Sequence, residues 1–319
     1  MVVVEVETFN PKEKGVFKMP VERFICPDGK EQFVSECLVE CRMKSRCMFL
    51  PTLQVIARAQ ERTTDFTVTE LIGGTREAYL KRTMRYAIDP QKQMFSMQGN
   101  AVHHFMQQFS NVKILQEIRL QGDGYSGQFD MYGQLLGFER DTLGDIKVTS
   151  SYKISKALGY RQESVDTGTV YQSGARKGQA RKRKIWHEDG TRGVFDWALQ
   201  LNAYRILLSL YGLSVNKMVI QAICRDGSLR VAQERNLDRA VYLIPIRKMS
   251  DLWVKKYLGM KRDRLKEAMD NQAMPPVCRK RERWNDRKCK DFCEVSQFCD
   301  YAQSLKNANV VHLRKEKAA

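Results

Sequence analysis

Two short segments near the middle of the chain decide the predicted fold: Gly127-Gln-Phe-Asp130 and Gly144-Asp-Ile-Lys147. Both have the character of short strands. The residues between them include the turn formers Gly133, Gly137 and Asp141. A hairpin of this kind can bring Asp130 beside Asp145. Because side chains alternate between the two faces of a strand, Asp145 and Lys147 are expected to point the same way.

Two carboxylates and one ammonium group on a single surface suit a divalent cation. Hard cations such as Mg2+ prefer oxygen ligands, and a lysine can lie next to the water that the cation activates. The pattern Asp-x-Lys is short and arises often by chance, so a solvated hairpin with ordinary surface charges is an equal alternative at this point.

The chain has 319 residues and a net charge of +17, from 54 Lys and Arg against 37 Asp and Glu. Such an excess favours a polyanionic partner, and nucleic acid is the commonest one. The alternative is a basic protein without such a partner. No apolar run approaches the roughly 20 residues of a membrane span. The N-terminus, Met1-Val-Val-Val-Glu, lacks the basic start of a signal peptide. We therefore expect a cytoplasmic protein with no membrane partner.

Eight of the nine cysteines form two quartets with the same spacing, C-x10-C-x3-C-x5-C. The quartets are Cys26, Cys37, Cys41, Cys47 and Cys278, Cys289, Cys293, Cys299. In a cytoplasmic chain such sets are read as metal ligands before disulfides. Four thiolates can close a tetrahedral zinc site or carry an iron–sulfur cluster, and spacing does not separate the two. We expect Zn2+ in each quartet, with [4Fe-4S] as the alternative. The ninth cysteine, Cys224, is expected to be a buried small apolar residue.

Hydrophobic periodicity predicts a helix, three strands, a second helix, two further strands and a last helix. The helices are expected over 93–109, 194–210 and 250–270, and the strands over 112–120, 125–132, 143–149, 217–224 and 240–246. In the second helix, Gln200 and Tyr204 are four residues apart and share one face. The apolar residues expected to face the core are Leu199, Ala203, Ile206, Leu207 and Leu210.

A polar, glycine-containing and strongly basic segment covers residues 171–193. We expect it to be a flexible loop that contacts phosphates and gives affinity without sequence specificity. Its basic residues are Arg176, Lys177, Arg181, Lys182, Arg183 and Lys184. A solvated loop with no ligand is the alternative.

Taken in order, these features resemble the PD-(D/E)XK nuclease superfamily, and specifically its RecB-type exonuclease branch, which includes CRISPR-associated adaptation nucleases. The resemblance covers about residues 66–247. It rests on Gly99-x3-His103, Gly127-x2-Asp130, Asp145-Ile-Lys147 and Gln200-x3-Tyr204. It implies an α/β (α+β) fold with a restriction-endonuclease-like core, in which helices flank a central mixed sheet. The expected domains are a cysteine module at 1–50, the nuclease core at 51–271, and a second cysteine module with a tail at 272–319.

The resemblance also implies a metal-dependent DNA nuclease, and among nucleases we expect an exonuclease. His103, Asp130, Asp145 and the carbonyl of Ile146 would bind Mg2+ or Mn2+. Lys147 would orient or deprotonate the attacking water, or offset charge at the phosphate. Gln200 would position Lys147 or the phosphate, and Tyr204 would touch the nucleic-acid backbone. The chain has no ATP-binding loop of the G-x4-GK[ST] kind, so a helicase or recombination partner would be a separate chain.

One departure from the family concerns the cysteines. Iron–sulfur members have a cysteine two residues before the arginine that corresponds to Arg76, where this chain has Gly74. Because each quartet here is complete, we expect each to close its own site. Two other functions stay open: a non-catalytic DNA-binding protein with this fold, and a zinc-module scaffold that binds a partner protein.

Overall fold

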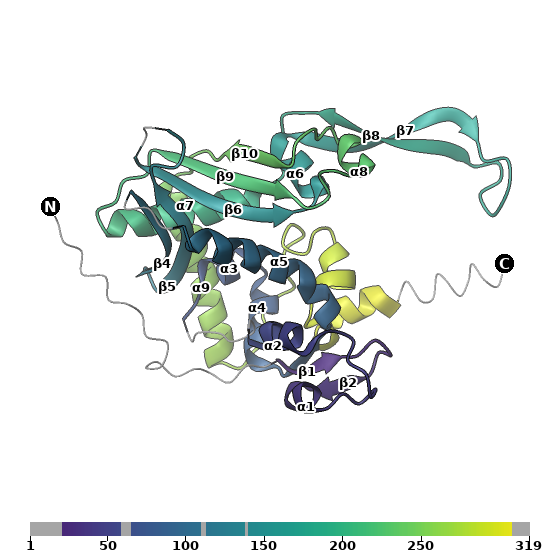
Figure 1. The fold of residues 1–319 in the computed structure, drawn as a ribbon, viewed down its shortest axis with the longest axis horizontal. Helices are drawn as coiled ribbons and strands as arrows, with labels where there is room; N and C mark the ends of the chain where they lie inside the picture. The colour runs from purple at the N-terminus through teal and green to yellow at the C-terminus, as the bar shows by residue number, and fades with distance from the viewer. Residues whose placement is uncertain (1–20, 59–64, 110–112, 138–139, 308–319) are drawn as a thin grey trace. The chain divides into compact units, whose positions relative to one another are not determined.

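The computed structural model describes residues 21–58, 65–109, 113–137 and 140–307 (Figure 1). The chain divides into two compact units. The first contains the residues up to Met97 and those from Leu258 onward, and the second is Gln98–Tyr257. The boundaries expected after residues 50 and 271 do not coincide with this division. It falls instead within two long helices, α5 (Pro90–Gln107) and α9 (Asp251–Asp270).

A five-stranded mixed sheet, in the order β10-β9-β6-β5-β4, forms the centre of the second unit (Figure 1). Its strands are β4 (Ile114–Gly122), β5 (Tyr125–Gly133), β6 (Thr142–Thr149), β9 (Lys217–Cys224) and β10 (Val241–Pro245). Only the β6–β9 pair is parallel. All five strands were predicted, with ends that differ by at most two residues. The inner strand β9 is largely buried, which explains its almost continuous apolar sequence.

Helices flank this sheet. Helix α7 (Phe195–Leu210) packs on β4, β5 and β6, while α6 (Ser151–Leu158) contacts β9, β10 and the short α8 (Arg230–Gln233). The residues of α7 that were predicted to face the core are fully buried, namely Leu199, Ala203, Ile206 and Leu207. The same prediction was wrong for Leu210, which is 49% exposed because it lies at the last position of the helix. Gly212 follows with a φ of 74°, the left-handed conformation that ends a helix.

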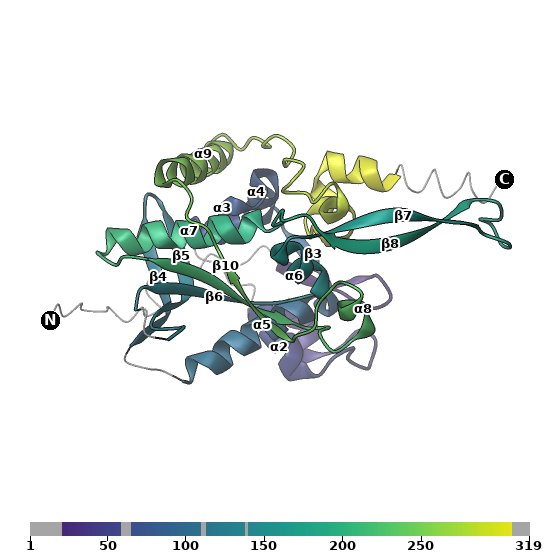
Figure 2. The same cartoon turned by 90° about the horizontal axis from the view of Figure 1, so that it is seen from above.

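The second unit also contains a two-stranded antiparallel ribbon, β7 (Tyr160–Val170) and β8 (Ala180–Glu188). It extends away from the five-stranded sheet (Figure 2). The prediction of a flexible loop over 171–193 was therefore wrong for residues 180–188, which form a paired strand. Both faces of the ribbon are exposed, so no alternation of apolar and polar residues marks these strands in the sequence.

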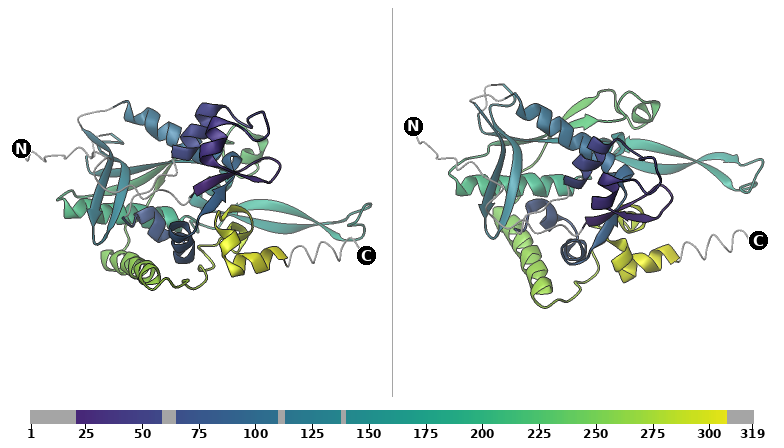
Figure 3. Two further views of the ribbon diagram at one scale, coloured as in Figure 1. Left: turned by 90° about the horizontal axis from the view of Figure 1, so that it is seen from below. Right: turned by 60° about the horizontal axis from the view of Figure 1, so that its bottom comes forward.

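The first unit contains a small sheet in the order β2-β1-β3, made of β1 (Val21–Ile25), β2 (Glu31–Phe33) and β3 (Tyr86–Ile88). Four helices that lie wholly within this unit are α1 (Val34–Val39), α2 (Leu50–Arg58), α3 (Val68–Ile72) and α4 (Thr75–Thr83) (Figure 3). A π-helical turn, Lys288–Phe292, and a 3-10 turn, Ser296–Phe298, follow near the C-terminus. The strands were not predicted, because three to five residues carry too little periodicity.

Ion pairs join α4 to the C-terminal segment of the same unit. Arg76 donates to the carbonyl of Pro275 at 2.7 Å and pairs with Asp300. Glu77 pairs with Lys288 at 2.5 Å. The Glu77–Lys288 pair is largely buried, so removing either partner would leave an uncompensated charge. These contacts hold the C-terminal segment against α4.

Candidate functional site

The predicted hairpin is present, and its strands separate at the candidate site. Backbone pairing between β5 and β6 runs from Gly133 opposite Thr142 to Met131 opposite Gly144. Beyond this point the amide of Ile146 donates to Oδ2 of Asp130 at 2.6 Å. The carboxylate of Asp130 is thus held against the backbone of β6, next to Asp145.

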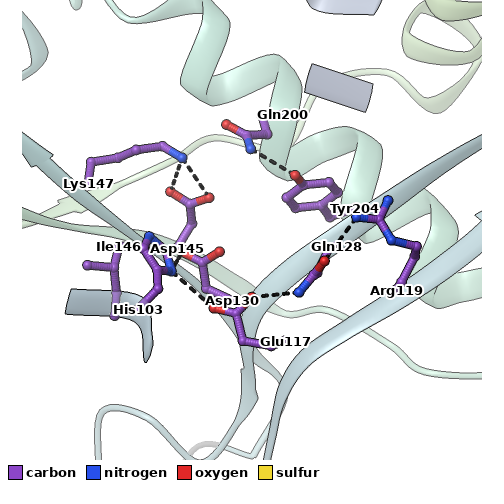
Figure 4. A network of polar contacts seen from close by, with 10 residues as sticks. All are labelled: His103, Glu117, Arg119, Gln128, Asp130, Asp145, Ile146, Lys147, Gln200 and Tyr204. Atoms are coloured by element: carbon purple, nitrogen blue, oxygen red, sulfur yellow. Dashed lines mark hydrogen bonds and ion pairs between the residues drawn. The ribbon is translucent and has the colours of Figure 1, made fainter. Parts of the chain in front are cut away.

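Three side chains converge beside this hairpin from α5, β4 and β5 (Figure 4). Nδ1 of His103 lies 3.0 Å from Oε1 of Glu117 and 3.6 Å from Oδ2 of Asp130. One potential ligand atom from each residue lies within 4.8 Å of the others. Among the residues that the structure describes, this is the only such group of three or more His, Cys, Asp or Glu side chains.

Sequence reasoning missed Glu117. The residue lies inside β4, between the pairs Gln116–Met131 and Ile118–Phe129, so the strand register places it opposite Asp130. Its φ of 51° is in the left-handed region, which interrupts regular pairing at this point. The register of the hairpin would have identified Glu117, but the sequence alone does not supply that register.

A hydrogen-bonded chain orients Glu117. Oε2 of Glu117 accepts from the amide of Gln128 at 2.9 Å, and Oε1 of Gln128 accepts from Arg119 at 3.0 Å. Oε1 of Glu117 contacts Nδ1 of His103, so both carboxylate oxygens of Glu117 have fixed neighbours. A carboxylate held in this way is preorganised for a ligand.

Asp145 and Lys147 form an ion pair in which Asp145 is buried and Lys147 is partly exposed, as expected for residues on the same face of a strand. Nζ of Lys147 lies 2.9 Å from Oδ1 and 2.8 Å from Oδ2 of Asp145. Only Oδ1 meets the geometry of a hydrogen bond. In the described structure Oδ2 is buried without a hydrogen-bond partner. A buried carboxylate oxygen without a full set of donors suits a cation ligand.

Several ionisable side chains lie close together at this site, where burial and neighbouring charges shift their pKa values. Burial and the neighbouring Asp145 raise the pKa of Asp130 to about 7. The hydrogen bond with Glu117 raises the pKa of His103, with further contributions from Asp130 and Asp145. Burial alone would lower the pKa of Lys147, but Asp145 and Asp130 outweigh it and raise that pKa. Without a cation, the site therefore favours bound protons.

Gln200 and Tyr204 lie together on α7, as predicted. Nε2 of Gln200 donates to the hydroxyl of Tyr204 at 2.8 Å (Figure 4). The ring of Tyr204 is only 4% exposed and packs against Gly127, where an added Cβ would lie 2.7 Å from ring atom Cε1. Tyr204 is thus buried, and its hydroxyl group holds the side chain of Gln200. The burial leaves little surface for the backbone contact expected of Tyr204.

All four cysteines of the N-terminal quartet line one cavity, together with Phe24 and Leu53. Burial, and then the neighbouring thiols, raise the pKa of Cys37. The shared cavity and the sulfur ligands suit a soft metal ion. No three sulfur atoms of this quartet lie within 4.8 Å of one another in the described residues, so the bound metal remains a prediction.

In the C-terminal quartet, Cys278 lies against α4. A Cβ added to Gly74 would lie 2.4 Å from its sulfur atom, so Cys278 fills the space that a side chain at position 74 would need. Burial raises the pKa of Cys289, and the thiols of Cys278 and Cys299 raise it further. These three thiols are therefore close to one another. Burial also raises the pKa of Cys293 to about 12. Here too metal binding is a prediction. Outside the quartets, Cys224 is buried as expected.

The predicted phosphate contacts lie on or beside the ribbon. Arg181, Lys182, Arg183 and Lys184 belong to β8, while Arg176 and Lys177 lie in the turn between the strands. All six residues are exposed. The guanidinium of Arg176 lies 5.9 Å from the ring centroid of Tyr171.

Comparisons with known proteins give no match for this chain, either among models of protein families or among curated proteins. The roles of its residues are therefore inferred from geometry and side-chain chemistry. Of the helices in the described residues, none is both long and apolar enough to cross a membrane.

Proposed function

We propose that the second unit is a divalent-metal-dependent DNA nuclease with a restriction-endonuclease-like core of the PD-(D/E)XK type. One observation carries this proposal: ligand atoms of His103, Glu117 and Asp130 converge within 4.8 Å, beside the ion pair between the buried Asp145 and Lys147. The net charge of +17 supports a polyanionic substrate.

The residues present fit Mg2+ or Mn2+. Asp130, Asp145 and Glu117 offer carboxylate oxygens and His103 offers an imidazole nitrogen, a donor set that hard divalent cations and Mn2+ accept. Oδ2 of Asp145 is buried and forms no hydrogen bond in the described structure, so it offers a lone pair to a cation alongside the nearby ammonium group of Lys147. When bound, the ion supplies Lewis-acid polarisation of the scissile phosphate and a more acidic bound water.

Lys147 acts as a cation in this proposal. Its ammonium group is held by Asp145, and its pKa is raised despite burial, so it carries a proton at neutral pH. In that state it orients the attacking water and offsets the charge that develops on the phosphate oxygens. Gln200 projects from α7, and its hydrogen bond to Tyr204 fixes its position (Figure 4), so that its amide would orient Lys147 or the phosphate.

The remaining roles complete the proposal. Each cysteine quartet holds a structural Zn2+ ion, with [4Fe-4S] as the alternative, which would stabilise segments that have little apolar core of their own. The enzyme works on DNA in the cytoplasm, and a helicase or recombination protein on another chain would supply any unwinding.

Cleavage of DNA by the purified protein tests the function. Linear single- and double-stranded DNA would be incubated with Mg2+ or Mn2+, beside a sample with EDTA. We expect metal-dependent cleavage that falls about 10²–10⁴-fold in Lys147→Ala, the range for losing a catalytic side chain. Lys153→Ala is the matched control, because Lys153 on α6 pairs with Asp196 and lies over the ring of Trp197, and neither of these α7 residues is a proposed ligand. A wild-type protein that is inert with both metals would refute the proposal. If it binds DNA without cutting it, the non-catalytic alternative holds.

A further inference from the structure

The β7–β8 ribbon is a basic surface that the proposed catalytic site does not use. From Tyr160 to Glu188 it carries seven Lys and Arg residues against three Asp and Glu. The basic residues are Arg161, Arg176, Lys177, Arg181, Lys182, Arg183 and Lys184. Four of them are consecutive in β8.

The basic side chains project from both faces of the ribbon. Lys182 pairs with Asp166 and Lys184 with Ser164, so these two lysines share one face. Arg183 pairs with Val165 and lies on the opposite face, as does Arg181 two residues before it. Because successive residues of a strand point to opposite faces, the run of four basic residues gives both faces of the ribbon a positive charge, as a ribbon between two rows of phosphates requires.

These side chains are available to a ligand. Within the described residues, none of Arg181–Lys184 forms an ion pair, although Asp166 is the cross-strand neighbour of Lys182. The carboxylate of Asp166 instead accepts from the amide of Gly168 at 2.9 Å. No carboxylate among the described residues therefore neutralises the positive charge of Arg181–Lys184.

The ribbon has the dimensions of a groove-binding element. Its longer strand has 11 residues, which at ~3.3 Å per residue reaches about one helical turn of B-DNA. A major groove about 12 Å wide admits a two-stranded ribbon. Both backbones of the duplex would then lie beside basic side chains.

The composition of the ribbon favours duplex over single-stranded DNA. Proteins that bind single strands stack bases on exposed aromatic side chains. Here Trp186 packs edge-on against Tyr152 at 5.4 Å, and the Arg176 guanidinium lies over Tyr171. The stretches 161–170 and 181–185 contain no aromatic residue. We propose that the ribbon inserts into the major groove of double-stranded DNA, with Arg181 and Arg183 facing one strand and Lys182 and Lys184 facing the other. This rests on the proposed function only in taking DNA as the partner.

Binding without cleavage tests the inference. Full-length Lys147→Ala protein in EDTA would be titrated with a fluorescent duplex of about three helical turns, and with one of its single strands. We expect tighter binding to the duplex. Since log K falls with log salt by about 0.9 per phosphate contact, removing all four charges with Gln at Arg181–Lys184 should lower the slope by about 3–4. The pairs R181Q/R183Q and K182Q/K184Q should each lower it by about 2. Arg230→Gln with Arg239→Gln, two exposed residues outside the ribbon, should leave the slope unchanged.

Hydroxyl-radical footprinting of the same complex locates the ribbon. Protection across one groove on both strands, lost in the fourfold variant, supports the inference. An unchanged affinity and salt slope in the fourfold variant overturns it, as does a preference for single strands that the four substitutions abolish. The two proposals fail separately. If wild type cleaves DNA and the fourfold variant binds normally, only the ribbon inference falls. If the variant loses duplex binding while wild type cleaves nothing, only the nuclease proposal falls.

Discussion

Nδ1 of His103 lies 3.0 Å from Oε1 of Glu117, a residue whose backbone has a φ of 51°. A non-glycine residue in the left-handed region costs on the order of 1–3 kcal/mol and persists where its surroundings hold it. Here Gln128 holds the other carboxylate oxygen at 2.9 Å. The strained backbone turns the side chain of Glu117 toward His103 and Asp130. The strain therefore helps to bring the three candidate metal ligands together.

Glu117→Gln should therefore weaken metal binding. The substitution keeps the shape and removes the charge, so the Mg2+ concentration for half-maximal cleavage should rise about 10–100-fold. Activity should partly recover at saturating Mg2+. A titration of the initial cleavage rate with Mg2+ measures both effects. Glu234→Gln, at an exposed residue paired with Arg230, is the control. An unchanged Mg2+ requirement would show that Glu117 is not a ligand.

Gly127→Ala should disturb helix α7 through Tyr204. The added Cβ would lie 2.7 Å from Cε1 of the buried ring, so the ring must shift and its bond to Gln200 weakens. Overpacking of this kind costs about 1–3 kcal/mol. Thermal unfolding and the cleavage rate should both report the loss. Gly99→Ala is the matched control for stability, since nothing lies within 4 Å of its added Cβ and alanine favours the helix. Equal melting temperatures for the two variants would contradict the prediction.

The sequence predicted the five-stranded sheet because its inner strands β5, β6 and β9 are largely buried and carry apolar side chains. Val219, Ile220 and Ala222 of β9 illustrate this. The β7–β8 ribbon lacks that signal, since Lys182 and Arg183 face solvent on opposite faces and burial selects neither face. Alternation of apolar and polar residues arises when one face of a strand is buried. A strand with two exposed faces therefore shows no such alternation.

The candidate site was predicted only in part, for a similar reason. Asp145 and Lys147 are two residues apart, so the alternation of a strand is enough to bring them together. Glu117 reaches Asp130 only through the register of β4 on β5, which depends on tertiary packing. The burial of Tyr204 likewise depends on Gly127 of a distant strand, a contact that no local pattern contains.

Glu77 should make the stability of the first unit depend on pH. Burial alone would raise the pKa of Glu77, but the ion pairs with Lys288 and Lys81 outweigh burial and hold it below the usual 4.5. A carboxyl group with a lowered folded-state pKa stabilises the protein above its unfolded pKa. That stabilisation is lost as the pH falls through the folded value. Glu77→Gln should therefore destabilise the protein at pH 7 by up to about 3–5 kcal/mol, the range for breaking a buried pair.

Urea unfolding from neutral pH down to about pH 3 checks this prediction. The difference between wild type and Glu77→Gln should be full at neutral pH and shrink below the unfolded pKa of about 4.5. Glu31→Gln, which removes an exposed pair with Arg23, should change little at any pH. A difference that stays constant down to the acid end would mean that packing, and not charge, is what Glu77 contributes.

The cysteine quartets should each bind metal, and the contact between Gly74 and Cys278 gives a way to separate them. Anaerobically purified wild type should contain about two Zn2+ ions per chain if each quartet closes a tetrahedral site. Gly74→Ala places a Cβ where the Cys278 sulfur lies, 2.4 Å away, so it should empty the C-terminal site and leave about one ion. Cys41→Ser should empty the N-terminal site instead, and Cys224→Ser, outside both quartets, should change nothing. Elemental analysis with a visible spectrum measures the outcome. A brown sample that contains iron would show that the quartets hold [4Fe-4S] clusters and not zinc. If both quartet variants keep the metal content of wild type, the two proposed sites are refuted.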